Sequence, residues 1–254
     1  MQKLILRQDD LSFRTREAYK TLRSNIEFSG RGVRVITITS CTPNEGKSEV
    51  SFELGLSFAE NNRRVLLIDA DLRKSVMREH LLKGRVRYGL SNYLVGQCPI
   101  EECICETDRK NFDMILAGPV TPSPSELLGS ETFDQLLQEA RSRYDYVIID
   151  SPPLGSVIDA AIVGQKSDGI ALVLASGTIS YRFAQRIVDQ LVKAHCRILG
   201  CVLNKVDMDN RKGYYGNYYG KYYGRYYGSY YGSDDYYGQS GVQNTGNGRR
   251  KGGR

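Results

Sequence analysis

The sequence lacks the long apolar run that a membrane-spanning helix requires. Such a helix needs about 20 consecutive apolar residues, and the longest comparable run here extends only from Gly169 to Ala175. Histidine is also scarce, because His80 and His195 are the only two and neither has a partner at catalytic or metal-binding spacing. We therefore expect both histidines to be structural, and any work at a membrane to depend on a partner that recruits the chain.

Two further absences narrow the class of protein. The six cysteines include no C-x-x-C pair and follow no signal peptide, which favours reduced thiols in the cytoplasm. Neither the H-R-D catalytic loop nor the D-F-G motif occurs in the chain. The chain is therefore not an ordinary protein kinase.

The net charge of +6 belongs to one end of the chain. Residues 211–254 hold eight lysines and arginines against two aspartates, which leaves 27 charged residues of each sign in residues 1–210. The same end repeats adjacent tyrosine pairs separated by glycine, and it contains neither leucine nor isoleucine. Such a segment cannot build a core, so we expect residues 209–254 to form a disordered tail. Self-association through stacked tyrosines is the alternative for this segment.

The motif that predicts chemistry is S-C-T-P-N-E-G-K-S-E, which occupies residues 40–49. A β-branched run precedes it, and apolar residues at helical spacing follow it. A strand-to-helix turn of this kind offers backbone N–H groups to phosphates, while Lys47 reaches the β- and γ-phosphates and Ser48 binds Mg²⁺. Cys41 stands where the usual pattern has its first glycine. The predicted ATP-binding residues are Pro43, Asn44, Glu45, Gly46, Lys47, Ser48 and Glu49.

Three aspartates follow predicted strands and are expected to meet this loop. Asp69 and Asp71 come after the apolar run 65–68, and Asp150 ends the run Y-V-I-I-D. Continuous apolar runs are typical of buried parallel strands, and ligand sites lie beyond their carboxyl ends. One of Asp69 and Asp71 would accept the proton of an attacking tyrosine while the other serves the metal, and the sequence leaves that choice open. The predicted catalytic residues are Lys47, Asp69, Asp71 and Asp150, and the predicted metal ligands are Ser48, Asp71 and Asp150.

Strands and helices alternate along the chain, which predicts a doubly wound α/β fold with a mostly parallel sheet and a P-loop core. The expected strands are 33–39, 64–69, 112–117, 146–150, 169–175 and 198–204. The expected helices are 14–28, 48–60, 131–143, 159–166 and 181–194, with two short ones within 75–96. Residues 1–12 and 98–110 are expected to be irregular. We divide the chain into a lead-in with an N-terminal helix (1–29), a P-loop domain (30–208) and the tail (209–254).

These motifs together resemble the bacterial tyrosine kinase family, of the type encoded with capsule and exopolysaccharide export systems. The resemblance rests on T-P-N-E-G-K-S at 42–48, L-L-I-D-A-D-L-R at 66–73, V-I-I-D-S-P-P at 147–153 and the tyrosine cluster. It implies an ATP- and Mg²⁺-dependent autokinase that phosphorylates tail tyrosines of neighbouring subunits. The implied acceptors are Tyr214, Tyr215, Tyr218, Tyr219, Tyr222, Tyr223, Tyr226, Tyr227, Tyr230, Tyr231, Tyr236 and Tyr237.

The resemblance also implies partners. The family's E-x-x-R-x-x-R motif for ring-type homo-oligomers reads Glu17, Lys20 and Arg23 here, and Lys20 lacks the planar fork of arginine. Residues 119–128 resemble the family's proline-bearing loop and short E-L-L helix. A separate transmembrane modulator would activate the kinase at the inner face of the cell membrane through a cytoplasmic segment. A protein-tyrosine phosphatase would reset the tail, polysaccharide polymerisation and export would be the regulated process, and no nucleic acid is implied.

Two other classes of protein are alternatives. Partitioning and division-site ATPases share the fold, but they carry a signature lysine five residues before the loop lysine, where this chain has Thr42. A dinitrogenase-reductase-like protein would need a cysteine pair that bridges a cluster, and none is suitably placed. A nucleotide-gated scaffold, whose tail binds partners or an anionic surface, is the second alternative.

Overall fold

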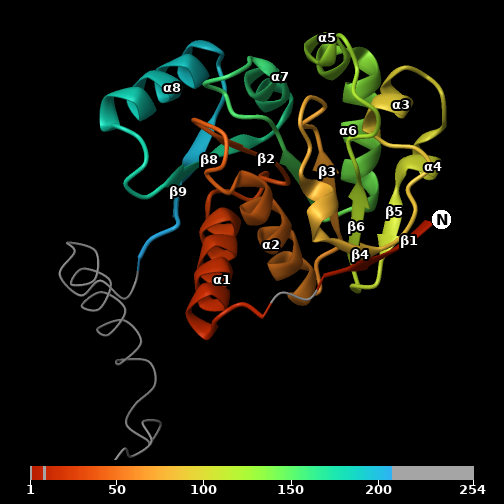
Figure 1. Ribbon diagram of the computed structural model, residues 1–254, viewed down its shortest axis with the longest axis horizontal. Coiled ribbons are helices and arrows are strands. Elements are labelled where there is room, and N and C mark those ends of the chain that lie inside the picture. Colours follow the sequence, from red (N-terminus) through yellow and green to blue (C-terminus); the bar gives the residue numbers. More distant parts are fainter. Residues whose placement is uncertain (1, 8–9, 208–254) are drawn as a thin grey trace, which may run out of the picture. The chain divides into compact units, whose positions relative to one another are not determined.

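A nine-stranded sheet is the central element of residues 2–7 and 10–207, the part of the chain that the computed structural model describes (Figure 1). Its strands are β1 (Gln2–Leu6), β2 (Val35–Ser40), β3 (Val65–Asp69), β4 (Leu81–Lys83), β5 (Cys105–Thr107), β6 (Phe112–Ile115), β7 (Tyr146–Asp150), β8 (Gly169–Ala175) and β9 (Ile198–Asn204). They lie in the order β4-β1-β5-β6-β3-β7-β2-β8-β9.

The strands from β6 to β9 in this order are all parallel to their neighbours. Antiparallel pairing occurs only near the other edge in the described part, between β5 and β6 and between β1 and β4. The predicted doubly wound, mostly parallel α/β fold is thereby confirmed. The connection that follows β2 passes β7 and leads to β3, whereas β8 pairs with β2 on the opposite side. The winding of the sheet therefore changes direction at β2, which is its topological switch point.

Helices connect the strands and cover both faces of the sheet. They are α1 (Phe13–Phe28), α2 (Lys47–Glu60), the 3₁₀ helix η1 (Met77–His80), α3 (Leu90–Leu94), α4 (Ile100–Cys103), α5 (Pro124–Gly129), α6 (Glu131–Arg143), α7 (Asp159–Lys166) and α8 (Tyr181–Lys193). The predicted bounds of α6, α7, β7, β8 and β9 are confirmed to the residue, and those of α1, α2, β2 and β3 to within two residues.

Two expectations from the sequence are wrong, and a third is incomplete. Residues 1–12 are not an irregular lead-in, because 2–6 form β1 within the sheet. Residues 98–110 contain α4 and β5 rather than an irregular connection. Within 75–96, η1 and α3 confirm the two short helices that were expected around a loop, but the short strand β4 also lies between them. Each missed strand has five residues or fewer, and each depends on pairing with residues far away in the sequence.

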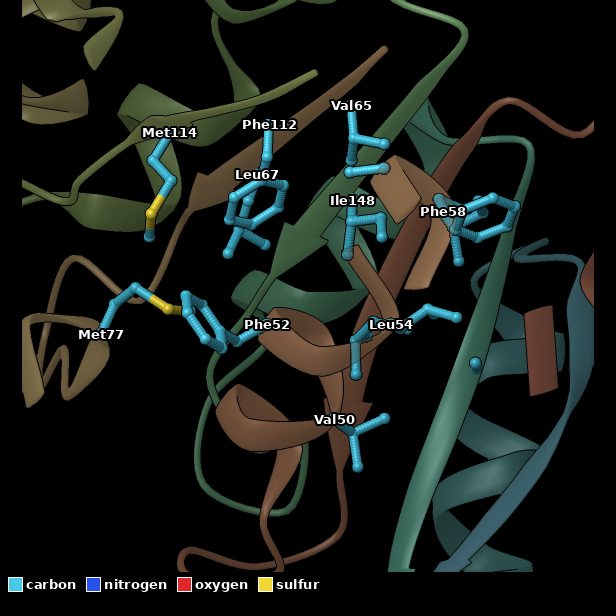
Figure 2. Packing of buried hydrophobic residues seen from close by; sticks show 14 of the residues in the cluster. Val50, Phe52, Leu54, Phe58, Val65, Leu67, Met77, Phe112, Met114 and Ile148 are labelled. Atoms are coloured by element: carbon cyan, nitrogen blue, oxygen red, sulfur yellow. The ribbon is translucent and has the colours of Figure 1, made fainter. Parts of the chain in front are cut away.

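Alternating side chains of the central strands divide the core between two faces. On one face, residues such as Leu67 and Ile148 pack against Val50, Leu54 and Phe58 of α2 (Figure 2). On the other face, the neighbouring positions 66, 68, 147 and 149 pack against α3, α4 and α6. A third cluster joins α7 and α8 to β8. Burial on both faces explains why the central strands read as continuous apolar runs.

Two expectations from composition concern single residue types. All six cysteines are free thiols. His80 is buried and stacks on Phe52 with ring centroids 4.3 Å apart, in keeping with a structural role.

Every helix in the described ranges is too short or too polar to cross a bilayer.

Replacing Leu4 by alanine tests whether β1 contributes to the core. Leu4 is fully buried, so Leu4→Ala should lower the free energy of unfolding by about 2–5 kcal/mol. The adjacent Ile5 points to the opposite face of the strand and is 39% exposed, so Ile5→Ala should cost less than half as much. Urea unfolding followed by circular dichroism measures both, and equal losses would contradict the burial of one face of β1.

Candidate functional site

The loop between β2 and α2 has the shape of a phosphate cradle. Asn44 and Gly46 both adopt the left-handed backbone conformation, with φ of 65° and 89°. Gly46 precedes the first residue of α2, and a Cβ there would lie 2.2 Å from the side-chain nitrogen of Asn204. The turn therefore needs glycine at this position, and it directs the first N–H groups of α2 toward the loop.

Cys41 occupies the position at which the usual pattern of this loop has its first glycine. Its side chain is fully buried and packs with Leu154 and Leu172, while its carbonyl accepts the N–H of Gly155 at 3.1 Å. A Cβ on Gly155 would lie 2.3 Å from that carbonyl oxygen, so the close approach requires glycine on the facing segment. Burial, followed by the charge of Glu45, raises the pKa of the Cys41 thiol to about 12. The thiol is therefore a packing group.

Glu45, predicted to bind ATP, uses its side chain to brace the loop. Its carboxylate accepts the backbone N–H groups of Thr42 at 2.7 Å and Ala175 at 3.3 Å. The segment after β9 adds two more bonds, from Asn204 to the Glu45 carbonyl at 3.0 Å and from Lys205 to the Asn44 carbonyl at 2.6 Å. The cradle is thus tied to the ends of β8, which adjoins β2, and of β9, which adjoins β8.

Lys47 lies at the centre of a buried charge cluster. Its ammonium is 3.2 Å from Asp71 Oδ2, 3.7 Å from Asp150 Oδ2 and 3.1 Å from the Ser48 hydroxyl. Ser48 donates to Asp150 Oδ2 at 2.6 Å, and Ser51 donates to Oδ1 at 3.1 Å. Burial lowers the pKa of Lys47, but the nearby Asp150 and Asp71 outweigh it and raise that pKa above its ordinary value. The ammonium therefore stays charged.

Asp69 and Asp150 are register partners at the adjacent ends of β3 and β7. Asp69 is fully buried and accepts hydrogen bonds from the Ser75 hydroxyl and from the N–H of Asp71 at 3.2 Å. Burial, followed by the charge of Asp150, raises the pKa of Asp69 to about 7. Burial likewise raises the pKa of Asp150, although Lys47 and the two serine hydroxyls oppose it. The structure thus brings together Lys47, Ser48, Asp69, Asp71 and Asp150 as the sequence predicted.

Comparison with known proteins places this geometry in a family. Residues 33–198 match the AAA domain family. Tyrosine-protein kinase CpsD of Streptococcus agalactiae is 38% identical over 205 residues, which cover 80% of this chain and 90% of that protein. The chain belongs to the bacterial tyrosine kinase family. Its predicted activity, that of a protein-tyrosine kinase, is confirmed at the level of the family.

Solved structures agree with this family assignment. The kinase domain of the Escherichia coli tyrosine kinase ETK is 36% identical to this kinase with a TM-score of 0.72, covering 75% of each chain. The septum site-determining protein MinD of Pyrococcus horikoshii, complexed with Mg-ADP, is 24% identical with a TM-score of 0.59 over 70% of this chain and 73% of its own. MinD shares the fold alone.

Several residues that shape the kinase site escaped sequence reasoning. Arg73 donates to both carboxylate oxygens of Asp159, at 2.7 and 3.0 Å, and Ser125 donates to the same carboxylate at 2.6 Å. These bonds fix the segment after β3 to the start of α7. Ser51 could have been found from its spacing, because it lies one helical turn after Lys47. Asn204 and Lys205 carried no local signal, because only the sheet order brings them to the loop.

The remaining predicted site residues lie apart from the cluster or outside the described chain. On α1, Glu17 pairs with Lys20 at 2.7 Å, whereas Arg23 donates to the Ser57 carbonyl of α2 at 2.6 Å. Within the predicted oligomerisation motif, Glu17 and Lys20 thus pair with each other, whereas Arg23 is hydrogen-bonded to α2. The twelve predicted acceptor tyrosines lie outside the described residues.

Replacing Asp69 by asparagine tests the buried charge cluster through pH. An aspartate of ordinary pKa 3.8 releases its proton in the unfolded chain, while Asp69 keeps it until about pH 7. Its contribution to stability is therefore fully present below about pH 4 and lost as the pH rises through 7. Relative to wild type, Asp69→Asn should gain more than about 2 kcal/mol of unfolding free energy between pH 4 and pH 8.

Urea unfolding at several pH values measures this difference. Asp189→Asn, on the exposed face of α8, is the matched control, because it removes a carboxylate that lies outside the buried charge cluster. A pH-independent difference for Asp69→Asn would show that Asp69 titrates normally in the folded kinase.

Proposed function

We propose that this kinase transfers the γ-phosphoryl group of ATP to the tyrosine cluster of a neighbouring copy of the same chain. The observation that carries the proposal is the ammonium of Lys47, held between Asp71 and Asp150 beneath the phosphate cradle. A cradle of N–H groups with one fixed lysine suits the charge of a nucleotide triphosphate. Phosphoryl transfer depends mainly on such positioning and charge neutralisation.

The donor set at the cradle suits Mg²⁺. Ser48 and Asp150 present a hydroxyl and a carboxylate that lie 2.6 Å apart, and Asp71 pairs with the Lys47 ammonium at 3.2 Å. Mg²⁺ prefers hard oxygen ligands of this kind and completes its shell with phosphate oxygens and water. Bound there, Mg²⁺ would neutralise charge on the β- and γ-phosphates. Ser48 and Asp150 are the residues that would hold it.

Asp71 is the better placed of the two carboxylates that the sequence left open. Asp69 is fully enclosed, whereas Asp71 lines a hollow of about 210 Å³. In the reaction, the phenolic oxygen of tyrosine forms a bond to the γ-phosphorus and the bond from that phosphorus to ADP breaks. The phenolic proton passes to Asp71. Asp69 holds the segment after β3 in place, because it accepts hydrogen bonds from the N–H of Asp71 and the hydroxyl of Ser75.

Further parts of the proposal rest on the family resemblance. A transmembrane modulator with a cytoplasmic activating segment would recruit the kinase to the inner face of the cell membrane. A protein-tyrosine phosphatase would remove the phosphates, and the cycle would regulate capsular or exopolysaccharide polymerisation and export. In the proposed ring, Glu17 and Lys20 would contact the neighbouring copy, because Arg23 is occupied by α2 of its own chain.

Mixing two inactive halves of the system tests transfer between chains. A chain ending at Asn210 keeps the proposed active site but lacks acceptors, and full-length Lys47→Met keeps the acceptors but lacks the essential ammonium. With Mg-ATP, the full-length Lys47→Met chain should gain phosphotyrosine only when the truncated chain is present. Without the truncated chain, autophosphorylation of Lys47→Met should be at least a hundredfold slower than that of wild type, because the lysine stabilises charge on the transferring phosphoryl group.

Intact-mass and phosphotyrosine analysis give the readout. Lys193→Met, at an exposed position on α8, is the matched control and should phosphorylate as wild type does. Autophosphorylation of Lys47→Met alone would remove the proposed site, and phosphate outside residues 214–237 would remove the tail as acceptor.

Lys20 offers a test of the proposed ring. Its side chain is 51% exposed and its ammonium already pairs with Glu17, so Lys20→Glu would place two like charges together at the contact. We expect this change to weaken self-association at least threefold, and Lys20→Arg to strengthen it through a planar fork. Sedimentation velocity over a concentration series measures both, with Lys193→Glu as control. Unchanged association in both variants would place the interface elsewhere.

A further inference from the structure

The hollow beside Asp71 is open to a substrate and carries unpaired positive charge. It lies between the segment after β3 and the loop after β6, with Gly118 and Val120 on its rim. Lys74 and Arg78 also line it, and both side chains are exposed. Among residues 2–7 and 10–207, neither cation has an ion-pair or hydrogen-bond partner for its side chain.

The third cation at this hollow behaves differently. Arg73 is held by both carboxylate oxygens of Asp159, so its charge is already neutralised within the fold. Lys74 is tied to the site through its backbone, because its N–H donates to Asp71 Oδ1 at 2.9 Å. Two free cations therefore lie on the approach to the carboxylate that would receive the tyrosine proton. Exposed lysines and arginines are ordinarily solvated, but a cationic pair beside a reacting group favours an anionic substrate.

The sequence of the tail divides its tyrosines by charge. Residues 211–227 contain eight tyrosines and four cations, Arg211, Lys212, Lys221 and Arg225. Residues 228–238 contain four tyrosines and the acidic pair Asp234–Asp235, which immediately precedes Tyr236–Tyr237. Neighbouring Cα atoms are about 3.8 Å apart, so those carboxylates reach the surroundings of any site that holds Tyr236.

We propose that Lys74 and Arg78 form an anion-recognition subsite that selects acceptor tyrosines with negative charge beside them. The first transfer then falls on Tyr236–Tyr237, because Asp234–Asp235 supply that charge. Each transferred phosphate adds about −1.5 to −2 charge next to the second tyrosine of its pair. The phosphate takes over the role of the aspartates, and the doubled tyrosines fill pair by pair. This inference rests on the proposed function, whose chemistry it leaves unchanged.

Site-resolved phosphorylation of the full-length chain tests the order. With Mg-ATP, early phosphate in the wild type should concentrate on Tyr236–Tyr237. In Lys74→Gln/Arg78→Gln, the ratio of phosphate at 236–237 to phosphate at 214–227 should fall at least threefold. The control Arg182→Gln/Lys193→Gln removes the same charge from exposed positions of α8 and should keep the wild-type order.

Replacing the acidic pair of the tail tests the same subsite from the side of the substrate. Asp234→Asn/Asp235→Asn should lose the early preference in the wild-type background and change nothing further when combined with Lys74→Gln/Arg78→Gln. Phosphotyrosine that forms in the wild-type order in the Lys74→Gln/Arg78→Gln chain would overturn the subsite while leaving the proposed function intact. A wild-type chain that forms no tail phosphotyrosine would overturn both.

A binding measurement separates recognition from catalysis. A fluorescent peptide of residues 229–238, phosphorylated at Tyr236, should bind the wild-type kinase at least threefold more tightly than the same peptide with asparagine at 234 and 235 and no phosphate. The Lys74→Gln/Arg78→Gln chain should bind both peptides equally. Equal binding of both peptides by the wild type would refute the subsite even in a chain that phosphorylates its tail.

Discussion

One ammonium among three buried carboxylates is the arrangement on which the site depends. Lys47 lies within 4 Å of Asp71 and Asp150, and Asp69 is the register partner of Asp150 on the adjacent strand. Burying charges is costly unless they are paired and hydrogen-bonded, and here the carboxylates outnumber the cation. Hydroxyls of Ser48 and Ser51 and the raised pKa of Asp69 offset part of that excess. The remaining excess of negative charge is of the kind that a bound divalent cation would neutralise.

Hydrogen bonds on both sides of β2 hold the charge cluster and the phosphate loop in place. Glu45 and Asn204 connect the phosphate loop to β8 and β9, whereas Arg73 connects the segment after β3 to α7. Each bond joins residues that are more than 80 positions apart in the chain. The cradle is therefore a property of the complete sheet, and the short motif supplies only the groups that face the phosphates. Cys41 can stand where the usual pattern has a glycine, because its backbone does not adopt the left-handed conformation and its side chain packs in the buried cluster with Leu154 and Leu172.

Sequence reasoning succeeded where chemistry and periodicity are local. Lys47 and Ser48 lie in one motif, and the three aspartates lie at or just after the ends of apolar runs whose parallel alignment brings them to one edge. It failed for β1, β4 and β5, because strands of three to five residues acquire their identity from partners elsewhere in the chain. Pairing of Asp159 with Arg73 was hidden for the same reason. A residue 86 positions away leaves no trace in the spacing around either partner.

The segment that follows β3 connects the two halves of the proposed reaction. In the structure, Asp71 has both carboxylate oxygens occupied, Oδ1 by the N–H of Lys74 and Oδ2 by the ammonium of Lys47. In the proposed reaction, a nucleotide phosphate that draws Lys47 toward the cradle would remove the ion pair at Oδ2, and that oxygen would then accept the phenolic proton. On this proposal, proton transfer to Asp71 would follow occupation of the cradle by the nucleotide. The same lysine would therefore align the donor and stay paired with the proposed base until the donor is present.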